Sequence, residues 1–372
     1  MFYISYYTTP DDVRASSPAA NAKTLSISKA LADVGESVKI ISTCTVAKSG
    51  RGFVRGRTFS VCENVTCRQT PFFITGFGPF RRLQYVMANV YLFLVLVLFA
   101  KKDENVLFYH AVERASVVAL AKKIKKFRLI LEVEEVYANA SKLSEREIEA
   151  EKRDISVADA FIFPTEMLND VVNKKNLPYA IIHGTYDVET VLNQQSDDKI
   201  HVVYAGTLSK IKGGAYAAAE SARFLGEKYS VHILGFGNNE QVEEIKSLAE
   251  RISAESGCRV SYEGCLNGEE YLRFIQACHI GLSTQNPQGN FNDTSFPSKI
   301  LTYMANGLQV VSARIPVVEG SDVDAYMNYY DSQTPESIAA AIKNVDLDNS
   351  IDTREIILKL NKKFKEKVKE VL

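Results

Sequence analysis

The sequence predicts an α/β protein made of two doubly wound parallel-sheet domains with a cleft between them. The chain has 372 residues, and a single hydrophobic core rarely extends over so many. The length therefore favours two domains. From the first residues onward, short β-branched or aromatic stretches alternate with helical patterns, as a parallel sheet with crossover helices requires. The same alternation starts again near residue 200 and predicts a second, similar sheet.

The N-terminal half opens with a βαβ unit. Strands are expected at 2–7 and 38–43, and the apolar positions of a helix recur between them until Gly35. Three more strands are expected at 106–110, 128–134 and 160–165, with helical stretches between them.

The C-terminal half repeats this order. Strands are expected at 201–206, 230–237, 259–264 and 280–285, and helices at 213–229, 241–256, 271–279 and 335–345. The polar stretch 193–199 is the expected linker. The expected domains are therefore 1–192 and 193–350, and an amphipathic helix at 353–372 is expected to pack back on the first.

Composition excludes several classes of protein. With 46% apolar and 24% charged residues, the chain is neither disordered nor fibrous. A net charge of −1 gives no global field for nucleic acid, so no nucleic-acid partner is expected. The six cysteines and five histidines lack zinc-ligand spacing, so no metal is expected. The N-terminus lacks the pattern of a signal peptide, which predicts a cytoplasmic protein with reduced cysteines.

One segment, 81–102, is strongly apolar. Its core from Val86 to Ala100 is about five residues short of the ~20 that span hydrocarbon, and Asn89 interrupts it, so a crossing is not predicted. It is either a helix buried in the first domain or a helix lying in a bilayer surface. In the second case its flanking cations would face anionic headgroups; these are Arg81, Arg82, Lys101 and Lys102.

Two segments of the C-terminal half could carry chemistry. In YAGTLSKIKGG, Lys212 and two glycines follow a strand, which suits a phosphate because backbone amides can approach closely. The second is FNDTSFPSKILTYMANGLQVVS, 291–312, where a helix is expected from near Pro297 to Gly307 with Ser295 as its N-cap. Amides from Thr294 to Ser298 would then face an anion, which would also relieve the cost of Lys299 in the first turn.

These segments carry a resemblance to a known family. YAGTLSKIKGG, LGFG, YEGCLNGEEYLRFIQACHIGLS and SFPSKILTYMANGLQVVS, in this order, resemble the donor-binding half of family 4 glycosyltransferases of the GT-B fold, which have two Rossmann-like domains. The N-terminal stretch ending at ALADVGESVKIIS is similar to that family's acceptor half. LEVEEVYANA, IIHGTYDVE and STQNPQGNFNDTSFPSKIL further resemble a bacterial subgroup of capsular and exopolysaccharide synthesis.

The resemblance implies a retaining transfer from a nucleotide-diphosphate sugar without a metal or another cofactor. It implies Lys212 on the donor diphosphate and three glycines near the nucleotide: Gly206, Gly235 and Gly237. It also implies a loop around diphosphate and sugar, made by Thr294, Ser295, Phe296, Ser298 and Lys299. In the N-terminal half it points to Glu134 and Glu135 for catalysis, with His110 as the other acid–base candidate. Ser16, Ser17 and Asn21 would line the acceptor side.

The sequence departs from the family at its polar ligands. The family's paired glutamates correspond to Thr294 and Thr302, and its arginine after the first donor-domain glycine corresponds to Thr207. A threonine binds a ribose hydroxyl more weakly than a carboxylate does. Nucleotide contacts are therefore rearranged or activity is reduced.

The sequence thus predicts a cytoplasmic hexosyltransferase in bacterial surface polysaccharide synthesis, with a saccharide or lipid-linked saccharide as acceptor and the membrane surface as a possible partner through 81–102. Two alternatives stay open. A nucleotide-sugar 2-epimerase would use the same architecture without an acceptor, and a non-catalytic subunit would bind nucleotide sugar or a partner enzyme without turnover.

Overall fold

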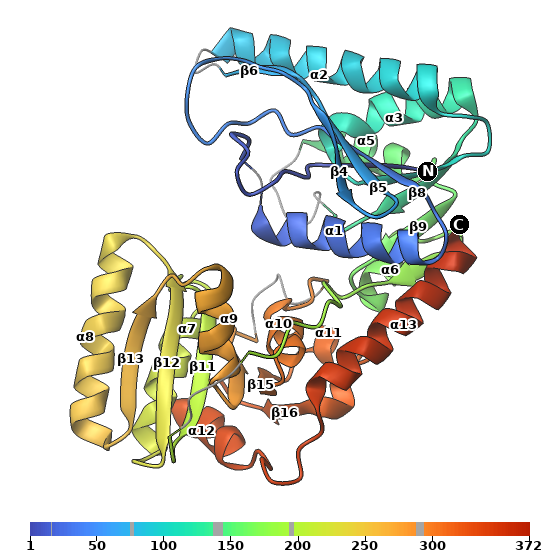
Figure 1. The fold of residues 1–372 in the computed structure, drawn as a ribbon. Coiled ribbons are helices and arrows are strands. Elements are labelled where there is room, and N and C mark those ends of the chain that lie inside the picture. The colour runs from blue at the N-terminus through green and yellow to red at the C-terminus, as the bar shows by residue number, and fades with distance from the viewer. Residues whose placement is uncertain (16, 75–77, 137–143, 193–196, 288–293) are drawn as a thin grey trace. The chain divides into compact units, whose positions relative to one another are not determined.

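The computed structural model describes residues 1–372 apart from 16, 75–77, 137–143, 193–196 and 288–293 (Figure 1). It divides into two compact units. Unit 1 comprises Met1–Thr185 and Lys362–Leu372, and unit 2 comprises Tyr186–Asn361. The first division falls before the expected 192/193 boundary, and the second falls inside the C-terminal helix α13 (Thr353–Val371).

Unit 1 is built on an eight-stranded sheet with the order β10-β9-β8-β7-β1-β2-β5-β4. All described pairings are parallel except that of β4 with β5. The strands are β1 (Phe2–Ser5), β2 (Val38–Ser42), β4 (Thr58–Cys62), β5 (Val65–Gln69), β7 (Asn105–Tyr109), β8 (Arg128–Glu132), β9 (Ala160–Phe163) and β10 (Tyr179–Ile181). The five strands expected in this half are confirmed.

A second, two-stranded antiparallel sheet joins β3 (Gly52–Val54) to β6 (Phe72–Ile74). No strand is expected from the sequence between 43 and 106, so β3 to β6 were missed. These strands are short, and only β5 has the alternating burial that a period-two pattern reveals.

Helices cover the faces of the unit 1 sheet. They are α1 (Pro18–Asp33), α2 (Gly78–Phe99), α3 (Val112–Lys125), α5 (Glu145–Ile155), α6 (Glu166–Val172) and the end of α13. The core is the apolar layer where α2 and α3 meet the sheet, including Leu92 and Leu96 of α2 and Val118 of α3. Local sequence sets the start of α1, because Pro18 supplies a helical φ and the Ser17 side chain caps the first turn.

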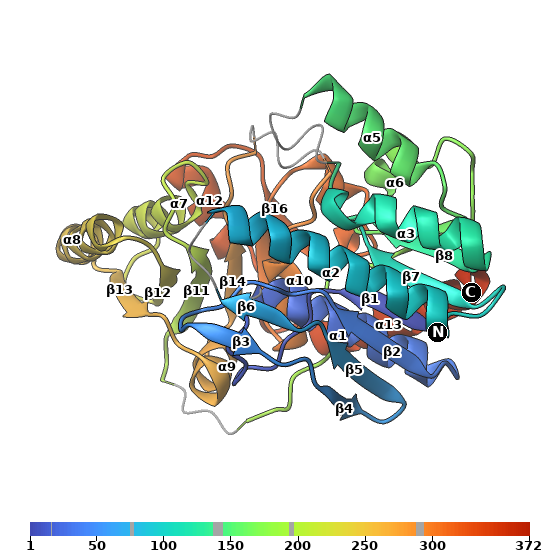
Figure 2. The same ribbon diagram turned by 90° about the horizontal axis from the view of Figure 1, so that it is seen from above.

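Of the two alternatives for 81–102, burial in the first domain holds for only one side of the helix, which includes Leu92 and Leu96. The helix α2 is longer than the apolar core counted from Val86, and its segment Phe80–Phe99 is long and apolar enough to cross a membrane by length and composition. Only 22% of the apolar stretch within this segment is buried. Its inner side packs on α3, and its other side faces solvent (Figure 2).

Unit 2 has a six-stranded, fully parallel sheet with the order β13-β12-β11-β14-β15-β16. The strands are β11 (Ile200–Thr207), β12 (Tyr229–Phe236), β13 (Arg259–Gly264), β14 (Ile280–Ser283), β15 (Gln309–Ala313) and β16 (Met327–Tyr330). The crossover helices are α7 (Gly214–Ser221), α8 (Asn239–Ser256), α9 (Gly268–Gln276), α10 (Lys299–Ala305) and α11 (Pro316–Glu319), and α12 (Pro335–Lys343) follows the last strand. The four strands expected in this half are confirmed as β11 to β14.

Candidate functional site

In unit 2, the ends of β11 and β12 approach each other closely. Gly206 and Gly235 are partners in the parallel register. A Cβ atom on Gly235 would lie 1.6 Å from the Gly206 carbonyl oxygen, and Gly235 has a φ of 142° that side chains rarely adopt. Only glycine fits at position 235, so the sequence there fixes how the carboxyl edge of the sheet is built.

A lysine ammonium lies at this edge. The Nζ atom of Lys299 sits 4.0 Å from the centre of the Tyr204 ring. A Cβ atom on Gly206 would be 3.1 Å from the same Nζ atom, so the absence of a side chain at Gly206 makes room for the cation. Burial, and secondly the charge of Lys212, lower the pKa of Lys299 to about 7.

Lys212 reaches the same edge from another segment. It lies in the exposed turn between β11 and α7, and its carbonyl accepts a hydrogen bond of 3.2 Å from the Asn286 amide. That bond ties the turn to the segment that follows β14. The charge of Lys212 thus acts on Lys299, which lies beside Gly206, although the two lysines come from distant parts of the sequence.

The predicted helix of the 291–312 segment differs from the helix that forms. It runs from Lys299 to Ala305, its N-cap position is Ser298, and no side chain caps it. The expected start near Pro297 and the Ser295 cap are therefore wrong. Pro297 instead offers its carbonyl to the amide of Ile300 at 3.0 Å, so the backbone makes a turn there before the helix begins.

Tyr303 holds α10 against the sheet. Its hydroxyl accepts a 2.7 Å hydrogen bond from the Ala205 amide of β11, and its ring fills the space that a side chain on Gly281 would occupy. Because Tyr303 is one helical turn after Lys299, this anchor helps to fix the lysine beside Gly206. The motif YAG of β11 and the helix KILTYMA are thus joined at one place.

The remaining predicted donor-binding residues lie around this edge. Thr207 is the last residue of β11, and its carbonyl accepts a 3.1 Å bond from the Tyr204 hydroxyl. Gly237 precedes the capping box of α8, and a Cβ atom there would lie 2.7 Å from Gln241 Oε1. Thr294 and Ser295 are half-buried and Phe296 is buried, whereas Ser298 is exposed. The part of the predicted loop at 291–293 lies outside the described residues.

Thr302 turns its hydroxyl toward its own helix. Its Oγ1 atom donates to the Ser298 carbonyl at 3.4 Å, and its carbonyl accepts a 2.9 Å bond from Asn306. A threonine hydroxyl in a helix commonly makes this bond to the preceding turn.

In unit 1, charged side chains gather where β8 ends. Glu134 is bonded to Lys23 of α1, and the fully buried Glu132 accepts a hydrogen bond from the Tyr3 hydroxyl of β1. Burial, and secondly the charge of Glu134, raise the pKa of Glu132 to about 7. Sequence reasoning singled out Glu134 and Glu135 but missed Glu132. The signal was available, since Glu132 interrupts an otherwise apolar strand.

His110 lies apart from this group. Its ring is buried, and its Nε2 atom is 3.3 Å from Glu151 Oε1 of α5, whose side chain is also buried. Its backbone amide donates to the Glu132 carbonyl at 2.8 Å. The arrangement packs α5 on the sheet, and the ring contacts the edge of Phe108.

Asn21 joins the loop after β1 to α1. Its side chain accepts from the Thr8 amide at 3.1 Å and donates to the Thr8 carbonyl at 2.9 Å. Ser17 caps α1, as described above, and Ser16 lies outside the described residues. The predicted acceptor residues Ser17 and Asn21 thus both fix the same loop and helix start.

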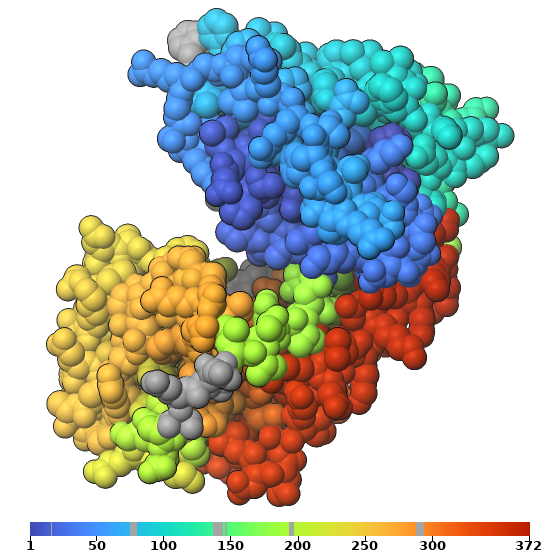
Figure 3. Space-filling model, in the orientation of Figure 1, coloured from blue at the N-terminus to red at the C-terminus, as the bar shows by residue number. Residues whose placement is uncertain are grey.

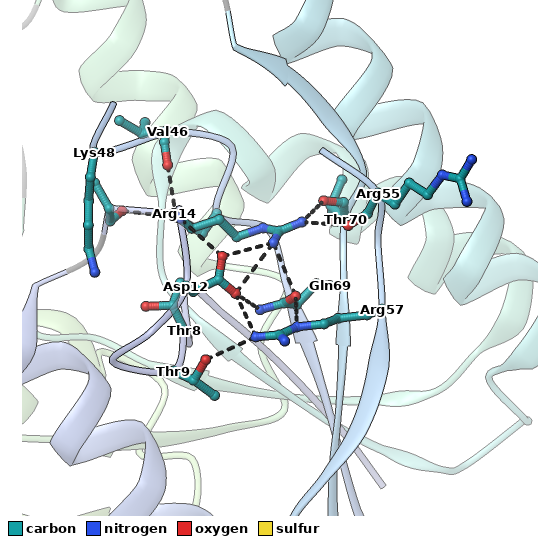
Figure 4. Close-up of polar contacts among 12 residues, drawn as sticks. Thr8, Thr9, Asp12, Arg14, Val46, Lys48, Arg55, Arg57, Gln69 and Thr70 are labelled. Carbon is teal, nitrogen blue, oxygen red and sulfur yellow. Dashed lines mark hydrogen bonds and ion pairs between the residues drawn. The ribbon is translucent and has the colours of Figure 1, made fainter. Parts of the chain in front are cut away.

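A buried ion-pair network holds the rest of that loop (Figure 4). Arg14, 2% exposed, donates to Asp12 and to Gln69 at 3.1 Å each, and also to the Thr70 carbonyl. Gln69 and Arg57 complete the contacts of the Asp12 carboxylate at 2.6 and 3.2 Å. Burial alone would raise the pKa of Asp12, but bonds from Arg14 and Gln69 outweigh it and lower that pKa. The loop is therefore tied to β5.

Comparisons with known proteins show which solved structures have a similar fold. No protein-family model matches the chain, and no curated protein matches it. Solved structures do. One is Anabaena HepE in complex with UDP and glucose, at 12% identity and a TM-score of 0.59, covering 99% of this chain and 96% of that one. Another is the lipopolysaccharide outer core galactosyltransferase WaaB, at 13% identity and 0.64, covering 100% and 99%.

A third is a glycosyltransferase from Rickettsia africae, at 12% identity and a TM-score of 0.65, covering 99% of this chain and 98% of that one. At such identities the likeness bears on architecture, and it extends over both units. The chain has the GT-B fold, which confirms the predicted fold class. Membership of family 4 and of the capsular subgroup stays a prediction.

Proposed function

We propose that this chain is a glycosyltransferase that moves a hexosyl group from a nucleotide-diphosphate sugar, held by unit 2, to a saccharide acceptor. The observation that carries the proposal is the position of the Lys299 ammonium beside Gly206, where the positive charge of Lys212 also acts on it. Two neighbouring cations destabilise each other, and the less solvated one has a depressed pKa, so a bound anion would remove a cost that the empty protein bears. A diphosphate suits the pair because it carries charge on two adjacent groups.

In the proposed reaction, the bond between the anomeric carbon and the diphosphate oxygen breaks, and negative charge grows on the leaving diphosphate. The ammonium groups of Lys212 and Lys299 would stabilise that charge. The acceptor hydroxyl bonds to the anomeric carbon and gives its proton to the leaving diphosphate or to a carboxylate. Glu134 and Glu135 are the candidate carboxylates. Retention of configuration and independence of metal are proposed from the resemblance of the motifs.

We further propose a lipid-linked saccharide as acceptor and a role in bacterial surface polysaccharide synthesis, at the cytoplasmic side of the plasma membrane. Support comes from the resemblance of LEVEEVYANA and IIHGTYDVE to the capsular subgroup. The HepE structure contains UDP and glucose, so UDP and UDP-glucose are the first probes to use.

Binding of UDP to the full chain, measured by titration calorimetry, tests the proposal. Lys212→Ala should weaken binding by about 10- to 100-fold, the value of one charge-assisted contact. Turnover with UDP-glucose should fall on the order of 10²-fold. Lys210→Ala is the matched control, because Lys210 lies in the same turn but pairs with Glu244 at 2.6 Å. Equal affinity of the Lys212 and Lys210 variants would refute the assignment.

The depressed pKa of Lys299 makes binding depend on pH. Near pH 8 the ammonium of the free protein is largely deprotonated, and a diphosphate favours its charged form, so binding takes up a proton. Affinity should therefore fall as pH rises from 7.5 to 9. Calorimetry in two buffers of different ionisation enthalpy would measure the proton uptake. The Lys299→Met variant keeps the contact with Tyr204 but has no titratable group, so it should abolish the proton uptake.

A second candidate is a subunit that binds nucleotide sugar without transferring the sugar. Thr294 and Thr302 favour it, because they stand where the resembled family has paired glutamates and because Thr302 bonds its own helix. Unimpaired UDP binding with no turnover across a panel of saccharide acceptors would identify this function.

A further inference from the structure

The helix α2 has two exposed arginines near its start, Arg81 and Arg82, but it turns the polar side chains of Gln84 and Asn89 toward the protein. Gln84 donates to the Thr45 carbonyl at 2.7 Å, and Asn89 accepts a 2.7 Å bond from Arg114 of α3. Leu92 and Leu96 pack in the core on the same side. The residue that interrupts the apolar segment in the sequence, Asn89, is therefore turned toward the protein.

On the opposite side of α2, the exposed side chains that recur at helical spacing are all apolar. We call this side the outer face, and it comprises Leu83, Val86, Met87, Val90, Leu94 and Leu98, which are 48–67% exposed. A surface helix of a soluble protein ordinarily has the reverse arrangement. Figure 3 shows α2, in cyan, at the surface of unit 1. An apolar face of this length marks an interaction surface.

Aromatic side chains extend this surface past the start of α2. The paired strands β3 and β6, the β3–β6 ribbon, expose Phe53 and Phe73 by 53% and 50%. The two rings face each other across the ribbon, with centres 4.8 Å apart. Figures 1 and 2 both show β6 beside the start of α2, and the two elements are in contact. Phe80 of α2, 58% exposed, adds a third ring near that end.

The charge along residues 37–102 is predominantly positive, and Lys102 pairs with Asp103, just past this stretch, at 3.9 Å. Between residues 37 and 102 the sequence has ten Lys and Arg and a single acidic residue, Glu63, in a protein whose net charge is −1. Exposed cations stand at both ends of the outer face and on the ribbon: Arg51, Arg55, Arg81, Arg82, Lys101 and Lys102. No acidic side chain occurs in α2.

We propose that unit 1 docks on an anionic lipid bilayer through the outer face of α2 and the β3–β6 ribbon. Apolar side chains would enter the boundary between headgroups and acyl chains, and the flanking cations would bind lipid phosphates. The helix lies along the surface and does not span the bilayer, because Leu92 and Leu96 on its inner side belong to the core.

The test is flotation of the full-length protein with vesicles of 70% phosphatidylcholine and 30% phosphatidylglycerol. We expect binding that falls steeply on pure phosphatidylcholine and at 500 mM salt. Arg81→Gln with Arg82→Gln should lower the partition coefficient by about 30-fold, from two lost charges. Lys228→Gln with Arg259→Gln, two exposed cations of unit 2, is the control and should change little.

The apolar contribution has its own pair of variants. Leu94→Gln with Leu98→Gln should abolish binding, whereas Leu358→Gln, on an exposed position of α13, should not. All these side chains are exposed, so the variants should melt at the wild-type temperature.

Two results would overturn the inference. One is binding to the anionic vesicles that is equally strong for the arginine variant and for its control. The other is a lipid-free dimer, seen by light scattering, that the leucine variant converts to a monomer, which would make the surface an interface between two copies. Neither result depends on UDP binding by unit 2, so failure here and failure of the proposed function are distinguishable.

Discussion

Glu132 has the most perturbed carboxyl group among the described residues that bear on the candidate site. It is fully buried, and its partners are the Tyr3 hydroxyl and, through space, the pair of Glu134 with Lys23. A carboxylate there is poorly solvated, which is why the native protein holds its proton up to about pH 7. The group belongs to the class of buried acids that are found at catalytic sites and in structural networks alike.

The Glu132→Gln variant should be more stable than the wild type at pH 8. Between pH 4.5 and 7 the unfolded chain loses the Glu132 proton while the native protein keeps it, so wild-type stability falls as pH rises through this window. The amide avoids that loss and still accepts the Tyr3 hydrogen bond. The expected gain is on the order of 3 kcal/mol at pH 8 and close to zero at pH 4. Urea unfolding at the two pH values measures it, and a gain independent of pH would contradict the argument.

Several site residues could be named from the sequence, but their environments could not. Lys212 and Lys299 were both predicted to bind the donor, from a glycine-rich turn and from a helix start. Their mutual effect at Gly206 depends on Tyr303, whose hydrogen bond to Ala205 joins residues far apart in the chain. The helix start itself was placed wrongly, because Ser295 and Pro297 carry cap signals that the turn at Ser298 overrides.

At the scale of elements, the close approach of the ends of β11 and β12 depends on one glycine, Gly235. Gly235→Ala would place a methyl group on the Gly206 carbonyl and force a strained φ, so we expect a loss of at least about 3 kcal/mol in unit 2. Gly320→Ala is the control, since its added methyl group would meet the nearest atom at 3.3 Å and its φ is −87°. Thermal unfolding of both variants gives the comparison. A Gly235 variant as stable as the Gly320 variant would show that the strand ends can separate.

The buried strands could be predicted from the sequence, but the short, exposed strands could not. Strands such as β8 and β12 are apolar along most of their length, and this pattern is visible in one sequence. In contrast, β3, β4 and β6 are short and largely exposed, so their side chains carry little pattern. The length and apolarity of α2 were visible, but its inverted orientation was not, because it depends on Arg114 pairing with Asn89.

At the scale of the molecule, the C-terminal residues complete unit 1. Phe364, Val368 and Val371 are buried there, Lys365 pairs with Asp33 at 2.7 Å, and the Val371 carbonyl accepts a bond from Arg128. Removing residues 362–372 exposes three apolar pockets, which is worth about 5–9 kcal/mol. That is as much as the whole stability of many domains.

The truncated protein should therefore lose unit 1 and keep unit 2. Calorimetric unfolding should show a lost or strongly lowered transition, while UDP affinity, which the proposed function assigns to unit 2, should persist. Val368→Ala should lower the same transition partially, and Leu358→Ala, at a position 56% exposed, should leave it unchanged. Retention of both transitions in the truncated protein would contradict the assignment of these residues to unit 1.

The return of the chain to unit 1 also has a consequence for synthesis. A ribosome makes Met1–Thr185 of unit 1 before unit 2, yet the segment that closes unit 1, 362–372, is translated only after unit 2. At about 5–20 residues per second, the intervening polypeptide takes on the order of 10–40 s to appear. During that interval the nascent unit 1 lacks residues 362–372, and the apolar surface that they cover is exposed. The yield of the protein in a cell should therefore depend on chaperones that shield this surface until the segment emerges.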